Sequence, residues 1–306
     1  MMRKYIKNAD KKVIDKKELL IKLSSQIEKI NLVAKSDTYI ENLNDIYQTL
    51  ELIDEEKDPF VHAMVGGYVR EFVTTFLVLY SGTNDLERSL EAHSLIKALT
   101  KYIVLLDRHY DEKNYEYKVR ADAIFKKIMS KVDGYIKHSI MHSMASLWAT
   151  ATYEINLRER MLRGEVFNRK EIRNHIFLKS SDTVLYGIIL DDAIDSFNPN
   201  IMQIIHYNQA VLDIQDDLND LEEDILRHDL NIFVMAACKQ VSLEDIYSGK
   251  VSPKEVVQKA TNVVQEIISD FAECIHFTMI PKEYAFLKML SANYIQTASQ
   301  DIVKYW

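Results

Sequence analysis

Three aspartates late in the chain have the spacing of a metal site. Asp216, Asp220 and Asp224 follow one another at intervals of four residues, so on a helix their carboxylates share one face. Like charges at this spacing destabilise a bare helix, and a column of three therefore predicts a cation among them. Mg²⁺ prefers carboxylate oxygens and often bridges to substrate phosphates. The spacing thus predicts a magnesium site for a phosphorylated substrate.

The same segment could instead be a solvated acidic helix face. Residues 216–229 carry seven acidic side chains, and a charge-rich stretch of this kind often faces water. Ile214, Leu218 and Leu221 argue against that alternative, because they anchor the helix on neighbouring sides.

A second acidic pair lies upstream, where Asp107 and Asp111 stand four residues apart at the end of an apolar helical pattern. Alone, such a pair is typical of a solvated helix end. Together with the three later aspartates, the pair indicates a shared binding site. Two acidic helix faces on opposite walls of one cavity could hold a cluster of Mg²⁺ ions and a diphosphate between them.

Helices must position all of these residues. Apolar residues recur at helical spacing along most of the 306 residues, and glycine (7) and proline (4) are scarce, which argues against a β-rich architecture. We expect an all-α fold in a single domain over residues 1–306, with residues 1–15 as a flexible basic N-terminus. The predicted helices are 16–33, 39–53, 59–80, 85–107, 117–132, 135–163, 169–190, 200–227, 230–240, 253–277 and 281–304.

The composition limits the class of function. Hydrophobic residues make up 47% of the chain, ample for a core, and the net charge of −8 gives no support for nucleic-acid binding. Cys238 and Cys274 form neither a disulfide framework nor a zinc site, which favours a reduced, cytoplasmic location. We see no signal peptide and no apolar run long enough to be a transmembrane segment.

Four segments together resemble the class I isoprenoid synthase superfamily, which includes trans-prenyltransferases and terpene synthases. Residues 214–220 (Ile-Gln-Asp-Asp-Leu-Asn-Asp) are similar to the second aspartate-rich motif of prenyl diphosphate synthases. Residues 105–112 (Leu-Leu-Asp-Arg-His-Tyr-Asp-Glu) resemble a degenerate first motif. Residues 66–70 (Gly-Gly-Tyr-Val-Arg) resemble an element that grips diphosphate, and residues 177–180 (Phe-Leu-Lys-Ser) resemble a Lys-Thr step whose lysine contacts the allylic diphosphate.

Two segments are also similar to terpene cyclases. Residues 216–224 match the spacing of the cyclase metal triad, with aspartate at all three ligand positions, where cyclases usually carry Asn, Ser or Thr, and Glu. Near the C-terminus, Lys304 and Tyr305 resemble the Arg-Tyr pair with which many cyclases bind diphosphate.

The chain departs from the elongating enzymes at several positions. Arg108 replaces an aspartate of the first motif, which puts a fixed cation beside the metal, and Tyr68 replaces the lysine of the glycine motif. The Arg-Arg-Gly that follows the first motif in those enzymes is absent, and the first cations of the next predicted helix are Lys118 and Arg120. This pattern favours an enzyme that ionises one allylic diphosphate and cyclises or quenches the cation.

The resemblance implies an all-α bundle around a central cavity, Mg²⁺ as cofactor (a cluster of ions, with Mn²⁺ as the alternative metal), a prenyl diphosphate substrate and a homodimer. We expect a terpene synthase; the alternatives are a prenyl diphosphate synthase that requires isopentenyl diphosphate, and a non-catalytic prenyltransferase-like subunit. The implied metal ligands are Asp107, Asp111, Asp216, Asp217, Asp220 and Asp224, and the catalytic residues among them are Asp107, Asp216 and Asp220. The implied substrate-binding residues are Arg70, Lys179, Gln215, Lys304 and Tyr305.

Overall fold

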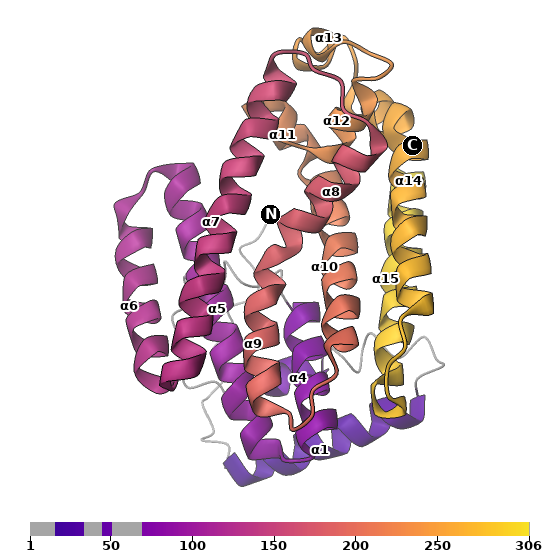
Figure 1. Cartoon of the computed structure of the whole chain (residues 1–306). Coiled ribbons are helices and arrows are strands. Elements are labelled where there is room, and N and C mark those ends of the chain that lie inside the picture. Colours follow the sequence, from indigo (N-terminus) through magenta and orange to yellow (C-terminus); the bar gives the residue numbers. More distant parts are fainter. Residues whose placement is uncertain (1–15, 34–44, 51–68, 306) are drawn as a thin grey trace, which may run out of the picture. The chain divides into compact units, whose positions relative to one another are not determined.

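The computed structural model describes residues 16–33, 45–50 and 69–305, and all regular secondary structure in these ranges is helical (Figure 1). The prediction of an all-α fold is confirmed. The longer helices are α1 (Lys16–Val33), α4 (Val69–Thr83), α5 (Leu86–Glu112), α6 (Tyr115–Lys131), α7 (Gly134–Leu162), α8 (Arg169–Lys179), α9 (Thr183–Ala193), α10 (Pro199–Asn219), α14 (Pro253–Phe277) and α15 (Ala285–Lys304). The short ones are η2 (Ser180–Asp182), α11 (Leu221–Arg227), α12 (Ile232–Ala237), α13 (Leu243–Tyr247) and η3 (Lys282–Tyr284).

The chain divides into two compact units, residues 1–73 and 74–306, and α4 runs across the boundary between them. Within the first unit, the side-chain amide of Gln26 on α1 donates to the carbonyl of Asp45 at 3.2 Å. The prediction of a single domain over the whole chain stays a prediction. The expected flexible N-terminus, residues 1–15, lies outside the described residues.

In the second unit, α10 is the core helix. It packs against α8, α9, α12, α14 and α15, and twelve of its residues are buried. Neighbours on several sides mean that its polar side chains cannot all reach water, so the buried ones need partners inside the protein. The buried polar residues of α10 are Asn208, Gln209, Asp213 and Asp217.

The predicted helix 169–190 is wrong in its middle, where the single 3₁₀ turn η2 separates α8 from α9. At this turn the Ser180 hydroxyl donates to Asp213 Oδ2 at 2.5 Å, and its oxygen lies 3.1 Å from the Ile176 carbonyl oxygen of the preceding turn. Serine side chains that bond to the preceding turn commonly distort a helix. The sequence pattern does not reveal the break, because Asp213 is 33 residues away.

The predicted helix 200–227 bends at Asp220, which separates α10 from α11. The helical hydrogen-bond pattern nevertheless continues through the bend. The Asp220 N–H donates to the Asp216 carbonyl at 2.9 Å, and the Asp224 N–H donates to the Asp220 carbonyl at 2.8 Å. The four-residue register of the three aspartates is therefore kept across the junction.

Helix α5 runs five residues beyond its predicted end, so Asp111 lies within its last turn. Lys113 ends the helix in a left-handed backbone conformation, with φ of 54°. In the described part of the chain, no helix combines the length and apolar character needed to cross a bilayer. The cytoplasmic location stays a prediction.

Candidate active site

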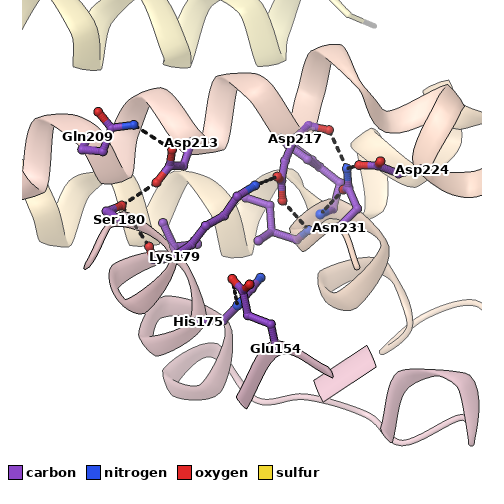
Figure 2. A network of polar contacts seen from close by, with 12 residues as sticks. Glu154, His175, Lys179, Ser180, Gln209, Asp213, Asp217, Asp224 and Asn231 are labelled. Atoms are coloured by element: carbon purple, nitrogen blue, oxygen red, sulfur yellow. Dashed lines mark hydrogen bonds and ion pairs between the residues drawn. The ribbon is translucent and has the colours of Figure 1, made fainter. Parts of the chain in front are cut away.

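Lys179 is the last residue of α8, and its side chain reaches across to α10 (Figure 2). Its Nζ donates to Asp217 Oδ1 at 2.7 Å, and the side chain of Asp217 is only 4% exposed. The other oxygen of Asp217 accepts from the Ile232 N–H at 2.9 Å. Desolvation opposes the charge on Lys179, but Asp217, Asp213 and Glu154 outweigh it and raise the pKa of the ammonium. A permanent cation is thus fixed among carboxylates.

Asp213 lies one helical turn before Asp217 and joins α10 to the η2 turn (Figure 2). It accepts from the Ser180 hydroxyl and, at 3.0 Å, from the Gln209 amide. Desolvation raises the pKa of Asp213, and the Lys179 charge opposes the rise. The sequence analysis missed this carboxylate because it precedes the Asp-Asp motif, although its four-residue spacing from Asp217 was a usable signal.

Asp216 and Asp220 are exposed, whereas Asp224 is half-buried. The surrounding protein desolvates Asp216, and together with repulsion from Asp213 it raises the pKa of that carboxyl to about 6. Desolvation likewise raises the pKa of Asp224 to about 6, with repulsion from Asp217 and Asp220 adding to the rise. Carboxylates that repel one another are stabilised by a bound cation.

Glu154 on α7 connects the two acidic segments electrostatically. Desolvation raises the pKa of Glu154 to about 7; the Lys179 charge opposes this rise, and Asp107 and Asp217 add to it. The carboxyl of Glu154 therefore lies within electrostatic range of both Asp107 on α5 and Asp217 on α10. The sequence does not mark Glu154, because no acidic residue lies three or four positions away on the same helix.

His175 lies next to Glu154, one helical turn before Lys179 (Figure 2). Its side chain is 3% exposed, and its Nδ1 is 3.9 Å from Glu154 Oε1, too far for a hydrogen bond. Desolvation lowers the pKa of His175 to about 4, so the ring is neutral at physiological pH. No pattern in the sequence singles out this histidine.

The first acidic segment has a different arrangement. Asp107 is exposed. Arg108 points along the helix surface to Glu112, at 3.2 Å, and the Tyr117 hydroxyl donates to the other oxygen of Glu112 at 2.9 Å. The guanidinium of Arg108, which stands in place of an aspartate of the first motif, is thus paired with the carboxylate of Glu112. The side chains of Asp111 and Arg70 lie outside the described part of the structure.

The remaining predicted residues lie near the C-terminal helix. The Gln215 amide donates to Asp301 Oδ2 at 3.0 Å, and Lys304 Nζ lies 3.4 Å from Asp301 Oδ1. Gln215 and Asp217 are two positions apart, so they face nearly opposite sides of α10. Desolvation and the nearby Glu222 raise the pKa of Tyr305. The structure therefore brings Gln215 and Lys304 together at Asp301, on another side of α10 from the Lys179–Asp217 pair.

The described residues contain no group of three His, Cys, Asp or Glu side chains that could hold a metal ion by itself. The chemistry of the donors still suits Mg²⁺, because all of them are carboxylates, and desolvation together with repulsion from neighbouring carboxylates raises the pKa values of Asp216 and Asp224. The carboxylates on α5, α10 and α11 thus fit a metal that binds together with an anionic substrate.

No protein-family model matches the chain, and no curated protein matches it. Solved structures do match. A geranylgeranyl pyrophosphate synthetase from the archaeon Geoglobus acetivorans has a TM-score of 0.59 and 16% identity, over 90% of this chain and 98% of that one. A polyprenyl synthase from Roseobacter denitrificans has a TM-score of 0.56 and 11% identity, over 92% and 99%. A geranylgeranyl pyrophosphate synthetase from Pyrococcus horikoshii has a TM-score of 0.51 and 15% identity, over 92% and 98%.

These similarities establish the fold. The chain adopts the all-helical architecture of the prenyl synthases, the class I isoprenoid synthase fold. The fold predicted from the sequence motifs is confirmed.

Proposed function

We propose that the protein is a metal-dependent enzyme that binds an allylic prenyl diphosphate beside Lys179 and breaks the bond between its carbon and the diphosphate oxygen. The main support is the Lys179 ammonium, held 2.7 Å from Asp217 among carboxylates, in a fold shared with three prenyl synthases. Negative charge builds on the leaving diphosphate as the bond breaks, and a fixed cation stabilises that charge.

In this proposal the acidic residues divide into two groups. Asp217 holds Lys179, because its two oxygens already accept from Nζ and from the Ile232 N–H. Mg²⁺, or Mn²⁺ in its place, supplies further positive charge to the diphosphate when bound. The residues proposed to hold it are Asp107, Asp111, Asp216, Asp220 and Asp224.

We favour chain elongation with isopentenyl diphosphate as the fate of the allylic cation. The three similar structures are all prenyl synthases, and this supports elongation over the cyclisation that the motif departures favoured. Arg108 is a weaker objection than the sequence alone indicated, since its guanidinium pairs with Glu112 at 3.2 Å.

A terpene synthase is the second candidate, and one observation favours it. Elongation needs cations for a second diphosphate. Two cations that follow the first acidic segment are engaged within α6, where Lys118 pairs with Asp122 at 2.6 Å and Arg120 pairs with Glu116 at 2.8 Å. Such pairs are weak and exposed, so a diphosphate could displace them, but they do not form a ready second anion site.

The experiment that tests the proposal is an incubation of the purified protein with Mg²⁺ and geranyl, farnesyl or geranylgeranyl diphosphate, with and without isopentenyl diphosphate. Diphosphate release and extracted products are measured together. Longer prenyl diphosphates that form only with isopentenyl diphosphate support elongation. Hydrocarbons or alcohols that form without it support a terpene synthase. No product in any tube contradicts both and favours a non-catalytic prenyltransferase-like subunit.

The metal assignment is tested by Asp216→Ala and Asp220→Ala. We expect each change to lower turnover by about 100-fold or more, because the developing charge loses part of its stabilisation, while far-ultraviolet circular dichroism stays unchanged. Asp191→Ala is the matched control, since Asp191 is an exposed aspartate at the end of α9. Full activity in both site variants would show that the assignment is wrong.

We further propose that the protein is a homodimer that pairs through α7. Four large apolar side chains of this helix are exposed at intervals of seven residues: Met141, Trp148, Ile155 and Leu162. Residues seven positions apart lie along one stripe of a helix surface, and an exposed apolar stripe of this kind marks an interaction surface. A second copy presents the same stripe, so the surface is self-complementary.

Mass in solution tests the dimer. We expect the unmodified protein to have twice the mass of the chain, and Met141→Glu or Leu162→Glu to give monomers by light scattering. Phe277→Glu is the control, because Phe277 is an exposed apolar residue at the end of α14. An unmodified protein that is monomeric, or a dimer that survives both changes, contradicts the proposed interface.

A further inference from the structure

Asn231 is the N-cap of α12 and is completely buried, with 0% exposure. Its Oδ1 accepts from the Phe233 N–H at 2.9 Å, as a capping asparagine should. Its amide nitrogen is used as well. Nδ2 donates to the Asp217 carbonyl at 2.6 Å and to Asp224 Oδ2 at 2.8 Å (Figure 2). One side chain therefore caps a helix and binds two residues of the acidic segment.

Ile232, the residue after Asn231, also forms a hydrogen bond to the acidic segment. The Ile232 N–H donates to Asp217 Oδ2 at 2.9 Å, so the first turn of α12 contacts Asp217 through a backbone group and Asp224 through a side chain. These bonds span the bend at Asp220, because Asp217 belongs to α10 and Asp224 to α11. The start of α12 thus fixes the two helices relative to each other at the proposed metal site.

The bond to Asn231 also selects between the two oxygens of Asp224. Oδ2 is engaged by the amide, whereas no hydrogen bond or ion pair from the described residues reaches Oδ1. A carboxylate held by one oxygen presents the other in a defined direction. Groups that hold metal ligands in this way are worth about 10–100-fold in metal affinity or activity.

We propose that Asn231 is a positioning residue that holds Asp224 with Oδ1 toward the metal and ties Asp217 to its bond with Lys179. This inference rests on the proposed function, because it takes Asp224 as a ligand of a divalent cation. Asparagine suits the position chemically: it offers an acceptor for the α12 cap and an N–H₂ donor for Asp224 at the same time. Aspartate and serine can cap a helix, but neither can make all of these bonds.

Asn231→Asp tests the proposal, since aspartate caps as well as asparagine does but lacks the amide and places a carboxylate against Asp224. The probe is Mn²⁺ with inorganic diphosphate, and binding is measured by calorimetry and by electron paramagnetic resonance. We expect affinity to fall at least about tenfold. Asn198→Asp is the matched control, because Asn198 caps α10 through a bond to the Asn200 N–H at 2.9 Å, and its affinity should be unchanged.

Asn231→Ser is a second test variant, for the case that Asn231→Asp fails to fold. Serine keeps an N-cap acceptor and adds no charge, so this change removes only the amide, and we expect a smaller loss of Mn²⁺ affinity in the same direction. Excess metal should restore the turnover of either variant, which a general loss of structure would not allow. Wild-type affinity in both variants would overturn the role of Asn231 alone. No Mn²⁺ binding by the unmodified protein would overturn the metal site, and the inference with it.

Discussion

The two acidic segments of this molecule are built in different ways. On α10 and α11, Asp213, Asp217 and Asp224 each accept hydrogen bonds from a named donor of another segment. At the end of α5, Asp107 is exposed, and the Arg108 ion pair runs along the helix surface. The difference follows from position, because carboxylates of a core helix need partners inside the protein, whereas those at a helix end have water.

This contrast shows which acidic segment is held in place by the protein's own hydrogen bonds. The second segment is held in place by Lys179, Ser180 and Asn231 before any ligand arrives. In the first segment, Asp107 is exposed at the end of α5, and the ion pair of Arg108 runs along the helix surface. Substitutions in the two segments should therefore differ in their effect, from the largest at Lys179 to the smallest at Arg108.

Lys179→Ala should have the largest effect, on the acidic segment of α10 and α11. It leaves the buried Asp217 carboxylate without its cation, and loss of a charged partner of a buried group costs about 2–3 kcal/mol. The same change removes the proposed diphosphate contact, so activity should fall as well. Urea unfolding and diphosphate release measure the two effects separately.

Lys250→Ala is the control for this change. Lys250 pairs with Asp245 at 2.9 Å, but its side chain is 67% exposed, so its removal should alter the free energy of unfolding by less than about 0.5 kcal/mol. Equal stability losses in the two variants would mean that the Lys179–Asp217 pair is no more than a surface ion pair.

Asp182→Asn should have an intermediate effect that depends on pH. Desolvation, with repulsion from Asp213, raises the pKa of Asp182 to about 7 in the folded protein. Between pH 4 and 7 the folded state keeps a proton that the unfolded state loses, so stability falls as the pH rises through this range. The asparagine variant escapes that fall. The rise from 3.8 to about 7 corresponds to at most about 4 kcal/mol. We expect a net gain of about 1 kcal/mol over the wild type at pH 8, or 2–4 °C in Tm, because asparagine weakens the backbone hydrogen bonds that the carboxylate accepts, and little gain at pH 4.

Asp245→Asn is a control of opposite sign. The hydrogen bond from Lys250 lowers the pKa of Asp245, so this carboxylate stabilises the fold above its unfolded pKa and loses the effect as the pH falls. The variant should be less stable than the wild type at pH 8 and equal to it in acid. Both proteins are unfolded thermally in metal-free buffer. A pH-independent gain for Asp182→Asn would rule out the proposed titration.

Arg108→Ala, in the acidic segment at the end of α5, should have the smallest effect. Its pair with Glu112 is a half-exposed contact between residues four apart, worth about 0.3–0.5 kcal/mol. Because the guanidinium points to Glu112, Mn²⁺ affinity should stay within about twofold of the wild type. A large rise in metal affinity would show that the Arg108 charge acts on the metal site after all.

The sequence predicted the helices and the acidic column because both depend on residues close together in the chain. The ranges 16–33 and 253–277 agree with α1 and α14 at both ends. The capping signals Ser252 and Pro253 explain the sharp start of α14. The four-residue aspartate spacing survived even the bend at Asp220, since the helical hydrogen bonds continue through it.

The rest of the site could not be predicted, because it depends on contacts between distant segments. Glu154 and His175 have no local pattern that marks them, and their surroundings include Asp217 on another helix. The local sequence marks Asn231 as a helix cap, but not its bonds to Asp217 and Asp224. The break at η2 has the same origin, since it involves Ser180 and Asp213. Periodicity reports which face of a helix is apolar, and it carries no information about partners across the core.

The η2 turn has one more consequence, for how the sequences of α8 and α9 can vary. A 3₁₀ turn advances about 120° per residue, against about 100° in an α-helix. Over the three residues of η2, the side chains of α9 are rotated by about 60° relative to those of α8. Substitutions on α9 therefore leave the register of Lys179 on α8, and its contact with Asp217, unchanged. Under the proposed function, the contact with diphosphate and the side chains of α9 can then change independently.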